Sequence, residues 1–351
     1  MRYNNEIYFT WRRLDGYPQP FKFALGAREP GKTTASWYGK IWTRFKKYKK
    51  PWIYLVRQAV EISEAAIESI RGIITKFDDN VPEFTYTKGS FKEGIVDVKV
   101  NGMLFIRIVS LNIPLRRIKL AIVQNLDGVF CDEYIIDPKT GEKYIPNEGF
   151  KIKEAYTTWR REANGTLKFY FVANPYSLFC PLFVELGVKT DELKAGEVWT
   201  NDLIAIERVV LHPKLREKLL KENPLYKFDE EYSDYAVEGN AKRDENIKLG
   251  TLPQNFSLRF IFKVDSKYIG VFRNGDYASE QDKFYCKFIT DFSKYRTIYC
   301  YDFGDLIERA VVMSIDERIK LAKFKDAIRE RKIAFEDINC YYFVMEIYKN
   351  I

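Results

Sequence analysis

A glycine-framed stretch near the start of the chain carries residue types that can hold phosphate groups. Residues 23–36 read FALGAREPGKTTAS, and Gly26, Gly31, Lys32 and Thr33 match the pattern G-x-x-x-x-G-K-[ST]. In this pattern successive backbone N–H groups surround an anion, the lysine adds positive charge and the hydroxyl binds Mg²⁺. The motif predicts an ATP-binding loop formed by Gly26, Arg28, Gly31, Lys32, Thr33 and Thr34.

The middle of this loop is unusual, because an acid and a proline stand where such loops normally offer backbone donors. Pro30 has no N–H, but residues 31–34 still supply consecutive donors. A carboxylate turned toward the phosphates would oppose nucleotide binding, so we expect Glu29 to face solvent.

Two adjacent carboxylates follow a later apolar segment, LDGVFC, at residues 126–131. At the carboxyl end of a central parallel strand, Asp132 can hold the Mg²⁺ that Thr33 also binds, and Glu133 can orient and deprotonate a water. A solvated strand end is the alternative reading of such a pair. The second carboxylate favours transfer of a phosphoryl group to water, and the sequence therefore predicts an ATPase that requires Mg²⁺.

Further polar residues surround the next apolar segment, LKFYFVAN, at residues 167–174. Asn174 can sense the γ-phosphate or hold the attacking water, although a strand-terminal turn at Pro175 is also compatible. Arg160 and Arg161 precede this segment and are candidates for an arginine finger, which a neighbouring subunit usually supplies. A solvated arginine pair fits them equally well.

Two basic runs interleave charge with aromatic or apolar residues, as a surface that contacts nucleic-acid phosphates would. They are RFKKYKK at 44–50 and IPLRRIKL at 113–120. Most such runs are only solvated faces. The candidate DNA or inter-subunit contacts in them are Lys46, Lys47, Lys49, Lys50, Arg116, Arg117 and Lys119.

The elements that must position these residues alternate between apolar strands and amphipathic helices. Strands are expected at 22–26, 51–57, 126–134 and 167–174, with helices after the first two and a hairpin around Asn101-Gly102. Such alternation predicts an α/β fold, with a mostly parallel sheet covered by helices on both faces.

The character of the sequence changes near residue 200. We expect a P-loop ATPase domain at 1–200, a charged helical linker region at 201–252 and an α+β domain at 253–351. The last domain is expected to contain short strands, a long charged helix at about 305–332 and a closing strand at 340–348.

Composition excludes several classes of site. The chain of 351 residues contains one histidine, His212, so multi-histidine metal sites and histidine-relay hydrolases are excluded. Its five cysteines have no zinc-type spacing. The net charge of +8 permits a polyanionic partner. The apolar stretch at 169–188 is broken by Asn174, Pro175 and Pro181, so no membrane helix is expected and the protein is expected to be intracellular.

The order of these motifs resembles the genome-packaging ATPases of small, protein-primed, short-tailed phages, which are terminase-like. The matching pieces lie within residues 20–190: GAREPGKTT, IYLVR, the hairpin followed by IPL, VFCDEY, YIPNE at 144–148 and VANPYSLFCPLFVELGV. The resemblance implies a P-loop ATPase of the class with an additional catalytic glutamate. It further implies a C-terminal domain similar to a ribonuclease H-type nuclease that has lost its catalytic carboxylates.

The same resemblance implies partners and a place of action. The chain would form a ring, by family likeness a pentamer, that works in the host cytoplasm and transiently on the portal vertex of a prohead. There it would drive double-stranded DNA inward, and relatives dock on a structural RNA. Lys32, Thr33, Asp132 and Glu133 would bind phosphate and Mg²⁺ and catalyse hydrolysis. Arg160 or Arg161 would be the finger that acts in trans, and Arg28 would contact the nucleotide or a neighbour.

Two other functions remain open from the sequence. A conventional terminase large subunit would carry an active nuclease, for which Asp265, Asp276, Asp282, Asp302 and Asp305 are available. A non-enzymatic module that docks on nucleic acid would bind no ATP through Lys32.

Overall fold

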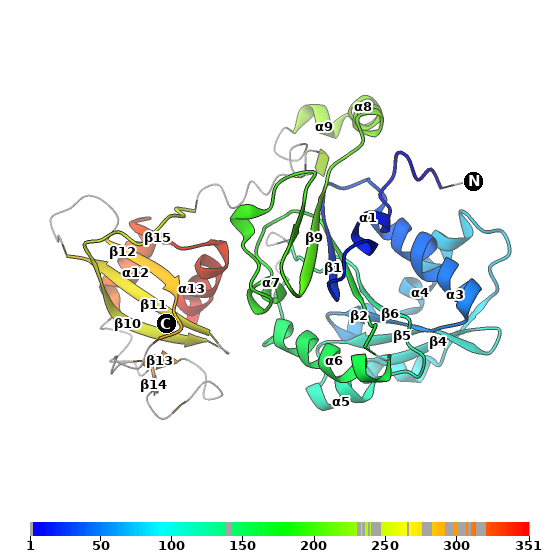
Figure 1. Cartoon of the computed structure of the whole chain (residues 1–351), viewed down its shortest axis with the longest axis horizontal. Helices are drawn as coiled ribbons and strands as arrows, with labels where there is room; N and C mark the ends of the chain where they lie inside the picture. Colours follow the sequence, from blue (N-terminus) through cyan, green and yellow to red (C-terminus); the bar gives the residue numbers. More distant parts are fainter. Residues whose placement is uncertain are drawn as a thin grey trace. The chain divides into compact units, whose positions relative to one another are not determined.

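The computed structural model describes the chain with short gaps and divides it into two compact units (Figure 1). The first unit comprises Met1–Val188 and Glu192–Lys242, and the second comprises Lys189–Asp191 and Arg243–Ile351. The described residues are 3–137, 140, 142–163, 165–229, 233, 236–237, 239, 247–264, 267–275, 283–291, 298–300, 307, 310–313 and 321–350.

A large sheet forms the centre of the first unit. Its strand order is β3-β4-β5-β2-β6-β7-β1-β9-β8, and the central run from β5 to β9 is parallel throughout. The antiparallel pairs of the described strands, β3–β4, β4–β5 and β8–β9, lie toward the two edges. The predicted α/β fold with a mostly parallel sheet is confirmed. The strands are β1 Phe21–Gly26, β2 Trp52–Val56, β3 Phe84–Thr85, β4 Ile95–Val100, β5 Met103–Ser110, β6 Gly128–Cys131, β7 Phe169–Ala173, β8 Val198–Thr200 and β9 Ile204–Val209.

Helices cover both faces of this sheet, as predicted. One apolar core packs Phe23 of β1 against Ile152 and Trp159 of α6, and the other packs Trp37 and Ile67 on the opposite face. The helical segments of the first unit, including the 3-10 and π-helical ones, are α1 Arg12–Asp15, α2 Lys32–Thr34, η1 Ala35–Trp42, α3 Thr43–Tyr48, η2 Ala59–Glu61, α4 Glu64–Thr75, η3 Lys88–Glu93, α5 Leu115–Leu120, α6 Glu148–Glu162, α7 Pro181–Glu185, α8 Pro213–Glu222 and α9 Leu225–Phe228. The short η5 (Thr190–Glu192) spans the boundary between the units.

The parallel order of the central strands decides where the site must lie. Strands β6, β7 and β1 are neighbours, so their carboxyl ends meet at one edge of the sheet. At the end of β1, Gly26 permits close packing against β9, because a Cβ atom there would lie 1.9 Å from the Val209 carbonyl oxygen. The hairpin β4–β5 turns at Asn101 and Gly102, whose φ angles are 51° and 78°, as its sequence predicts.

The predicted helical character of residues 201–252 is wrong at Ile204–Val209. These residues form β9, which pairs in parallel with β1 and is buried at five of its six positions. The many charges around this segment favour a solvated helix, whereas the strand itself, IAIERV, is mostly apolar. Helices α8 and α9 follow it, and no helix in the described part of the chain is long and apolar enough to cross a membrane.

The second unit contains a mixed sheet in the order β14-β13-β10-β11-β12-β15. Strands β10, β11 and β12 pair antiparallel, whereas β13 and β14 add in parallel beside β10. The elements are β10 Phe256–Val264, β11 Lys267–Asn274, β12 Phe284–Phe288, β13 Ile298–Cys300, β14 Ala310–Val312, α12 Ala322–Arg329, β15 Ile333–Phe335 and α13 Ile338–Asn350.

Two expectations for this unit are wrong. The closing segment at 340–348 is not a strand but part of α13, because Cys340, Phe343, Val344 and Ile347 recur at helical spacing and are buried. The Asp337 carboxylate also accepts the Cys340 N–H (2.8 Å) at the start of this helix. The helix expected at about 305–332 is only α12 where the structure describes it, since Ala310–Val312 form β14.

Candidate nucleotide-binding site

A pocket of about 620 Å³ lies at the edge of the sheet where β1, β6 and β7 end. Its lining includes the predicted loop from Arg28 to Thr34, together with Asp132, Glu133 and Asn174. Residues from three separate motifs therefore converge, because the parallel strand order brings their strand ends together. Gly26 lies at the base of the loop, where its carbonyl meets Lys32.

The phosphate loop ends in the first turn of a helix. Gly31 has a φ of +79°, a left-handed conformation that glycine adopts without strain, and Lys32 then begins α2. The buried Lys32 ammonium donates to the carbonyl oxygens of Gly26 (2.8 Å) and Ala27 (2.5 Å) and to Asn174 Oδ1 (3.3 Å). Burial lowers the pKa of Lys32 to about 7, although the Asp132 carboxylate opposes the shift. An anionic ligand in the pocket would restore the charged form.

Asp132 and Thr33 meet across the sheet edge in a way that suits a hard cation. Thr33 Oγ1 donates to Asp132 Oδ1 over 3.3 Å. Burial raises the pKa of Asp132 to about 7, the charge of Glu133 raises it further, and the bond from Thr33 opposes the shift. The nearby positive charge therefore does not offset the cost of burying the ionised Asp132 carboxylate. Hydroxyl and carboxylate oxygens are the ligands that Mg²⁺ takes in proteins, so the residues present fit this ion.

Glu133 faces the pocket from a strained backbone. Its φ of 47° lies in the left-handed region, which costs a residue other than glycine about 1–3 kcal/mol. The side chain is exposed and lines the pocket, so its carboxylate can contact water. Its own N–H donates to Asp132 Oδ1 over 3.0 Å. Strain of this kind persists only where the surrounding structure holds it.

The unusual residues in the middle of the loop have distinct surroundings. Glu29 is exposed, as predicted, and has a φ of 69°. The carbonyl of the buried Pro30 accepts the Phe9 N–H (2.8 Å). Arg28 donates to the hydroxyl of Tyr176, and its guanidinium lies 5.6 Å from the centroid of the Tyr176 ring. In this structure Arg28 therefore contacts its own chain, just beyond the strand end that carries Asn174.

The outer wall of the pocket was not predicted from the sequence. It is formed by Tyr3, Asn4, Tyr8, Lys76 and Phe77. The Tyr3 hydroxyl donates to the carbonyl of Phe9 (2.7 Å), and its ring meets the Phe77 ring edge-on at 5.6 Å. Flat aromatic faces of this kind suit a planar base. No motif marks these residues, and the high aromatic content of the first ten positions is the only signal that the sequence offers.

The two candidate finger arginines do not line this pocket. Arg160 and Arg161 are exposed in the last turn of α6, where positive charge also suits the helix dipole. The Arg160 guanidinium lies 5.6 Å from the centroid of the Tyr156 ring. Within one chain, therefore, neither arginine reaches the nucleotide site.

Ion pairs engage part of both basic runs. Lys46 contacts Asp78 (2.6 Å), Arg117 contacts Glu93 (3.5 Å) and Lys119 contacts Glu154. Lys47 and Lys49 lie near aromatic rings, at 4.9 Å from Tyr48 and 5.8 Å from Phe45. Among the described residues no acidic partner is found for Lys47, Lys49, Lys50 or Arg116, so these four keep their charge available to a polyanion.

Five aspartates are the candidate carboxylates of a nuclease site. Asp265, Asp276, Asp282, Asp302 and Asp305 lie outside the residues that the structure describes. Within the described ranges, no group of three or more His, Cys, Asp or Glu side chains is arranged to hold a metal ion.

Two solved structures share the fold of this chain along nearly its whole length. A chain of the bacteriophage Phi-29 viral genome packaging motor assembly is 18% identical, with 98% of this chain and 99% of that chain covered and a TM-score of 0.69. The Phi-28 gp11 DNA packaging motor is 16% identical, with 98% of each chain covered and a TM-score of 0.61. No protein-family model and no curated protein matches the sequence. The predicted resemblance to phage packaging ATPases is confirmed at the level of the fold.

Proposed function

We propose that this protein is a Mg²⁺-dependent ATPase that drives double-stranded DNA through a portal into a viral prohead. The observation that carries the proposal is the meeting of Lys32, Thr33, Asp132, Glu133 and Asn174 around one pocket. Two features support the packaging role: the fold shared with packaging motor proteins, and exposed basic residues beside the ATPase sheet.

Each residue at the pocket has a distinct role in the proposed reaction. The backbone N–H groups of residues 31–34 and the Lys32 ammonium bind the phosphates. Thr33 and Asp132 would hold Mg²⁺, which when bound would neutralise negative charge on the phosphates. Glu133 orients a water for attack on the γ-phosphate and accepts its proton. Asn174, which already contacts Lys32, is placed to sense the γ-phosphate.

We further propose that the protein acts as a ring, a pentamer by family resemblance, in the host cytoplasm and at the portal vertex. Arg160 and Arg161 are exposed and do not line the pocket of their own chain. In a ring, an arginine finger in this position would instead enter the nucleotide site of the neighbouring subunit. Arg28, which contacts Tyr176, would turn to the nucleotide or to that neighbour. Lys47, Lys49, Lys50 and Arg116 are the candidate DNA or inter-subunit contacts that retain free charge, and a structural RNA is a further candidate partner.

The second unit is proposed to be a ribonuclease H-type domain without nuclease activity. In the order β15-β12-β11-β10-β13-β14, the antiparallel strands β12, β11 and β10 are followed by β13 and β14 in parallel, which supports this assignment, and β15 adds in parallel beside β12. Strand β10, at the centre of that order, has the sequence FSLRFIFKV and contains no carboxylate. A metal-dependent nuclease needs several converging carboxylates. An inactive domain would instead serve to dock the motor on its partners.

The decisive experiment measures phosphate release from ATP by the purified protein in Mg²⁺, alone and on proheads with DNA. Weak hydrolysis by the free chain that rises on assembly is expected. Glu133→Gln should bind ATP and lose turnover by about 10²–10⁴-fold, whereas Lys32→Ala should not bind. Normal hydrolysis by Glu133→Gln would refute the assignment. Absence of Lys32-dependent ATP binding would favour a docking module, and plasmid cleavage in Mn²⁺ would favour an active terminase.

A further inference from the structure

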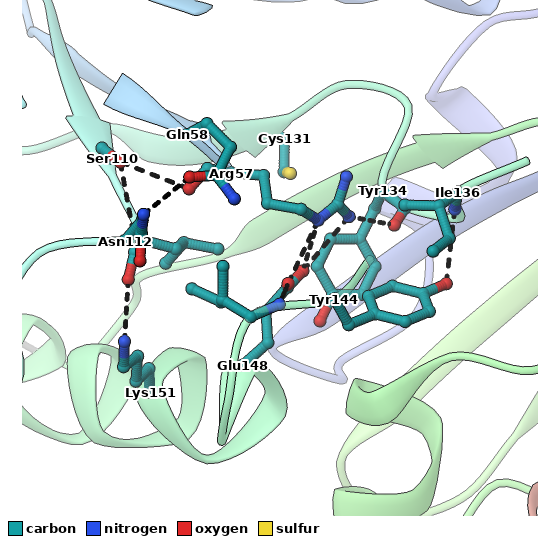
Figure 2. Close-up of polar contacts among 12 residues, drawn as sticks. Arg57, Gln58, Ser110, Asn112, Cys131, Tyr134, Ile136, Tyr144, Glu148 and Lys151 are labelled. Carbon is teal, nitrogen blue, oxygen red and sulfur yellow. Dashed lines mark hydrogen bonds and ion pairs between the residues drawn. The ribbon is translucent and has the colours of Figure 1, made fainter. Parts of the chain in front are cut away.

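A buried ion pair lies directly behind the strained residue Glu133. Arg57 follows β2, and Glu148 is the first residue of α6 and the last of the stretch YIPNE. Arg57 Nε lies 3.2 and 3.1 Å from the two carboxylate oxygens of Glu148, and Nη2 lies 3.2 Å from Oε1. The Glu148 side chain is fully buried and that of Arg57 is 12% exposed. Figure 2 shows the pair beside Tyr134 and Tyr144.

The guanidinium also holds the backbone next to the candidate catalytic residue. Arg57 Nη2 donates to the carbonyl oxygen of Tyr134 over 2.6 Å, and Tyr134 directly follows Glu133 (Figure 2). On the amino side of Tyr134, its N–H, which belongs to the peptide group shared with Glu133, donates to the Val172 carbonyl of β7 (3.1 Å). The two peptide groups flanking Tyr134, the residue directly after Glu133, are thus held by partners from two other strand ends.

Other contacts leave the guanidinium little freedom to move. Its carbon lies 5.7 Å from the ring centroid of Tyr134 and 5.2 Å from that of Tyr144. Glu148 Oε2 also accepts the N–H of Ile145 (3.0 Å). Burial alone lowers the pKa of Arg57, but the Glu148 carboxylate more than reverses this, so the pKa is raised overall and the guanidinium stays charged. Burial raises the pKa of Glu148, and the charge and hydrogen bonds of Arg57 oppose that shift.

A buried ion pair is weak evidence for stability, because apolar residues of similar size often stabilise a fold equally well. Apolar residues could not replace the pair here, because only a hydrogen-bond donor can bond to the Tyr134 carbonyl. Neither member lines the nucleotide pocket among the residues described. The pair is therefore placed to affect the position of Glu133 without touching the nucleotide.

We propose that Arg57 and Glu148 are positioning residues that keep Glu133 in its left-handed conformation and so aim its carboxylate at the attacking water. Glu148 acts through Arg57, and Arg57 acts through the Tyr134 carbonyl. Without this bond, Glu133 relaxes to an ordinary φ and its carboxylate moves away from the water. A misplacement of about 1 Å can cost about 10²-fold in rate. This proposal rests on the proposed ATPase function.

The test replaces both charges together, so that no unpaired charge stays buried. Arg57→Met combined with Glu148→Leu should keep the thermal midpoint and the dissociation constant for ATP near the wild-type values, whereas kcat should fall by about 10–100-fold. Arg57→Lys is the second variant. Its single ammonium cannot bond to both Glu148 and the Tyr134 carbonyl as the planar guanidinium does, so kcat should again fall with KM little changed.

A matched control exists elsewhere in the sheet. Arg107 of β5 contacts Asp97 through two bonds (2.6 and 2.7 Å) and also donates to the carbonyl of Ile122 (3.0 Å), but it does not line the pocket. The same exchange at that pair, Arg107→Met with Asp97→Leu, should leave kcat within about twofold of wild type.

The outcomes separate this proposal from the ATPase assignment. If the wild-type protein hydrolyses no ATP, or Glu133→Gln retains its activity, the proposed function fails. If the wild type is active and Glu133→Gln is not, but the Arg57/Glu148 double variant keeps full kcat, the positioning role alone is overturned. A parallel loss of kcat in the Arg107/Asp97 control would overturn it as well, because the effect would then come from general loosening of the sheet.

Discussion

Thr33 Oγ1 donates a hydrogen bond to Asp132 Oδ1 over 3.3 Å, although the two residues are 99 positions apart in the chain. Thr33 lies in the first turn after the phosphate loop, and Asp132 directly follows β6. The bond joins the two motifs that the sequence presents separately. The same two oxygens would be available to a divalent cation bound between these motifs, in place of this hydrogen bond.

Thr33→Val should therefore weaken the response of the enzyme to Mg²⁺. The change keeps the shape of the side chain but removes the oxygen ligand. The concentration of free Mg²⁺ that gives half-maximal ATP hydrolysis should therefore rise by about 10–100-fold. Titration of phosphate release against free Mg²⁺ measures this. Thr43→Val is the control, because the Thr43 hydroxyl bonds to the carbonyls of Gly39 (2.8 Å) and Lys40 (3.2 Å) in the preceding helical turn and does not line the pocket. An unchanged Mg²⁺ requirement in Thr33→Val would remove this residue from the metal site.

Binding of Mg²⁺ and ATP should be tightest near pH 7. The raised pKa of Asp132, about 7, means that the carboxyl must lose a proton to bind the ion at lower pH. The lowered pKa of Lys32, also about 7, means that the amine must gain a proton to bind phosphate at higher pH. Calorimetric titrations in buffers of different ionisation enthalpy should show proton release on binding at pH 6 and uptake at pH 8. Binding without proton exchange at either pH would contradict this.

Replacement of Glu29 should separate backbone strain from charge. Glu29→Gly removes the cost of the left-handed φ of 69°, so the protein should gain up to about 1 kcal/mol in its free energy of unfolding. Glu29→Ala removes the same charge but retains the strain. Both variants should bind ATP somewhat more tightly, because each removes a carboxylate from the lining of the pocket. Thermal unfolding and ATP titration check the two effects, and equal stability of the two variants would exclude a role for strain.

Alanine at Arg160 or Arg161 should affect only the assembled motor. These side chains do not line their own pocket, so the weak hydrolysis of the isolated chain should stay at the wild-type level. On proheads with DNA, loss of the residue that acts in trans should lower the ATPase rate by about 10³-fold or more. Assembly with mixtures of wild-type and variant subunits provides a second measurement. If both variants support full activity in the assembled motor, neither arginine is a finger.

Local sequence patterns predicted most of the first unit. The segments around Phe23, Phe130 and Phe171 are continuous apolar runs, which strands buried on both faces require. The mostly parallel pairing of the sheet could then be inferred, because alternating strands and helices favour it. The wrong predictions concern segments whose residue pattern is compatible with both a strand and a helix. The aromatic segment at 340–348 satisfies a buried strand and a helix alike, and its burial in α13 depends on the sheet that it covers.

The sequence by itself identified the residues of the proposed chemistry, because the candidate phosphate loop, the paired carboxylates and the strand-terminal amide each consist of residues adjacent in the chain. Only the tertiary structure decided which distant groups support them. The contact between Tyr3 and Phe77 and the pair formed by Arg57 and Glu148, 91 positions apart, cannot be inferred from any one segment. Such contacts depend on strand order and on the packing of α6 against the sheet, and these are set by burial of the whole core rather than by any one segment.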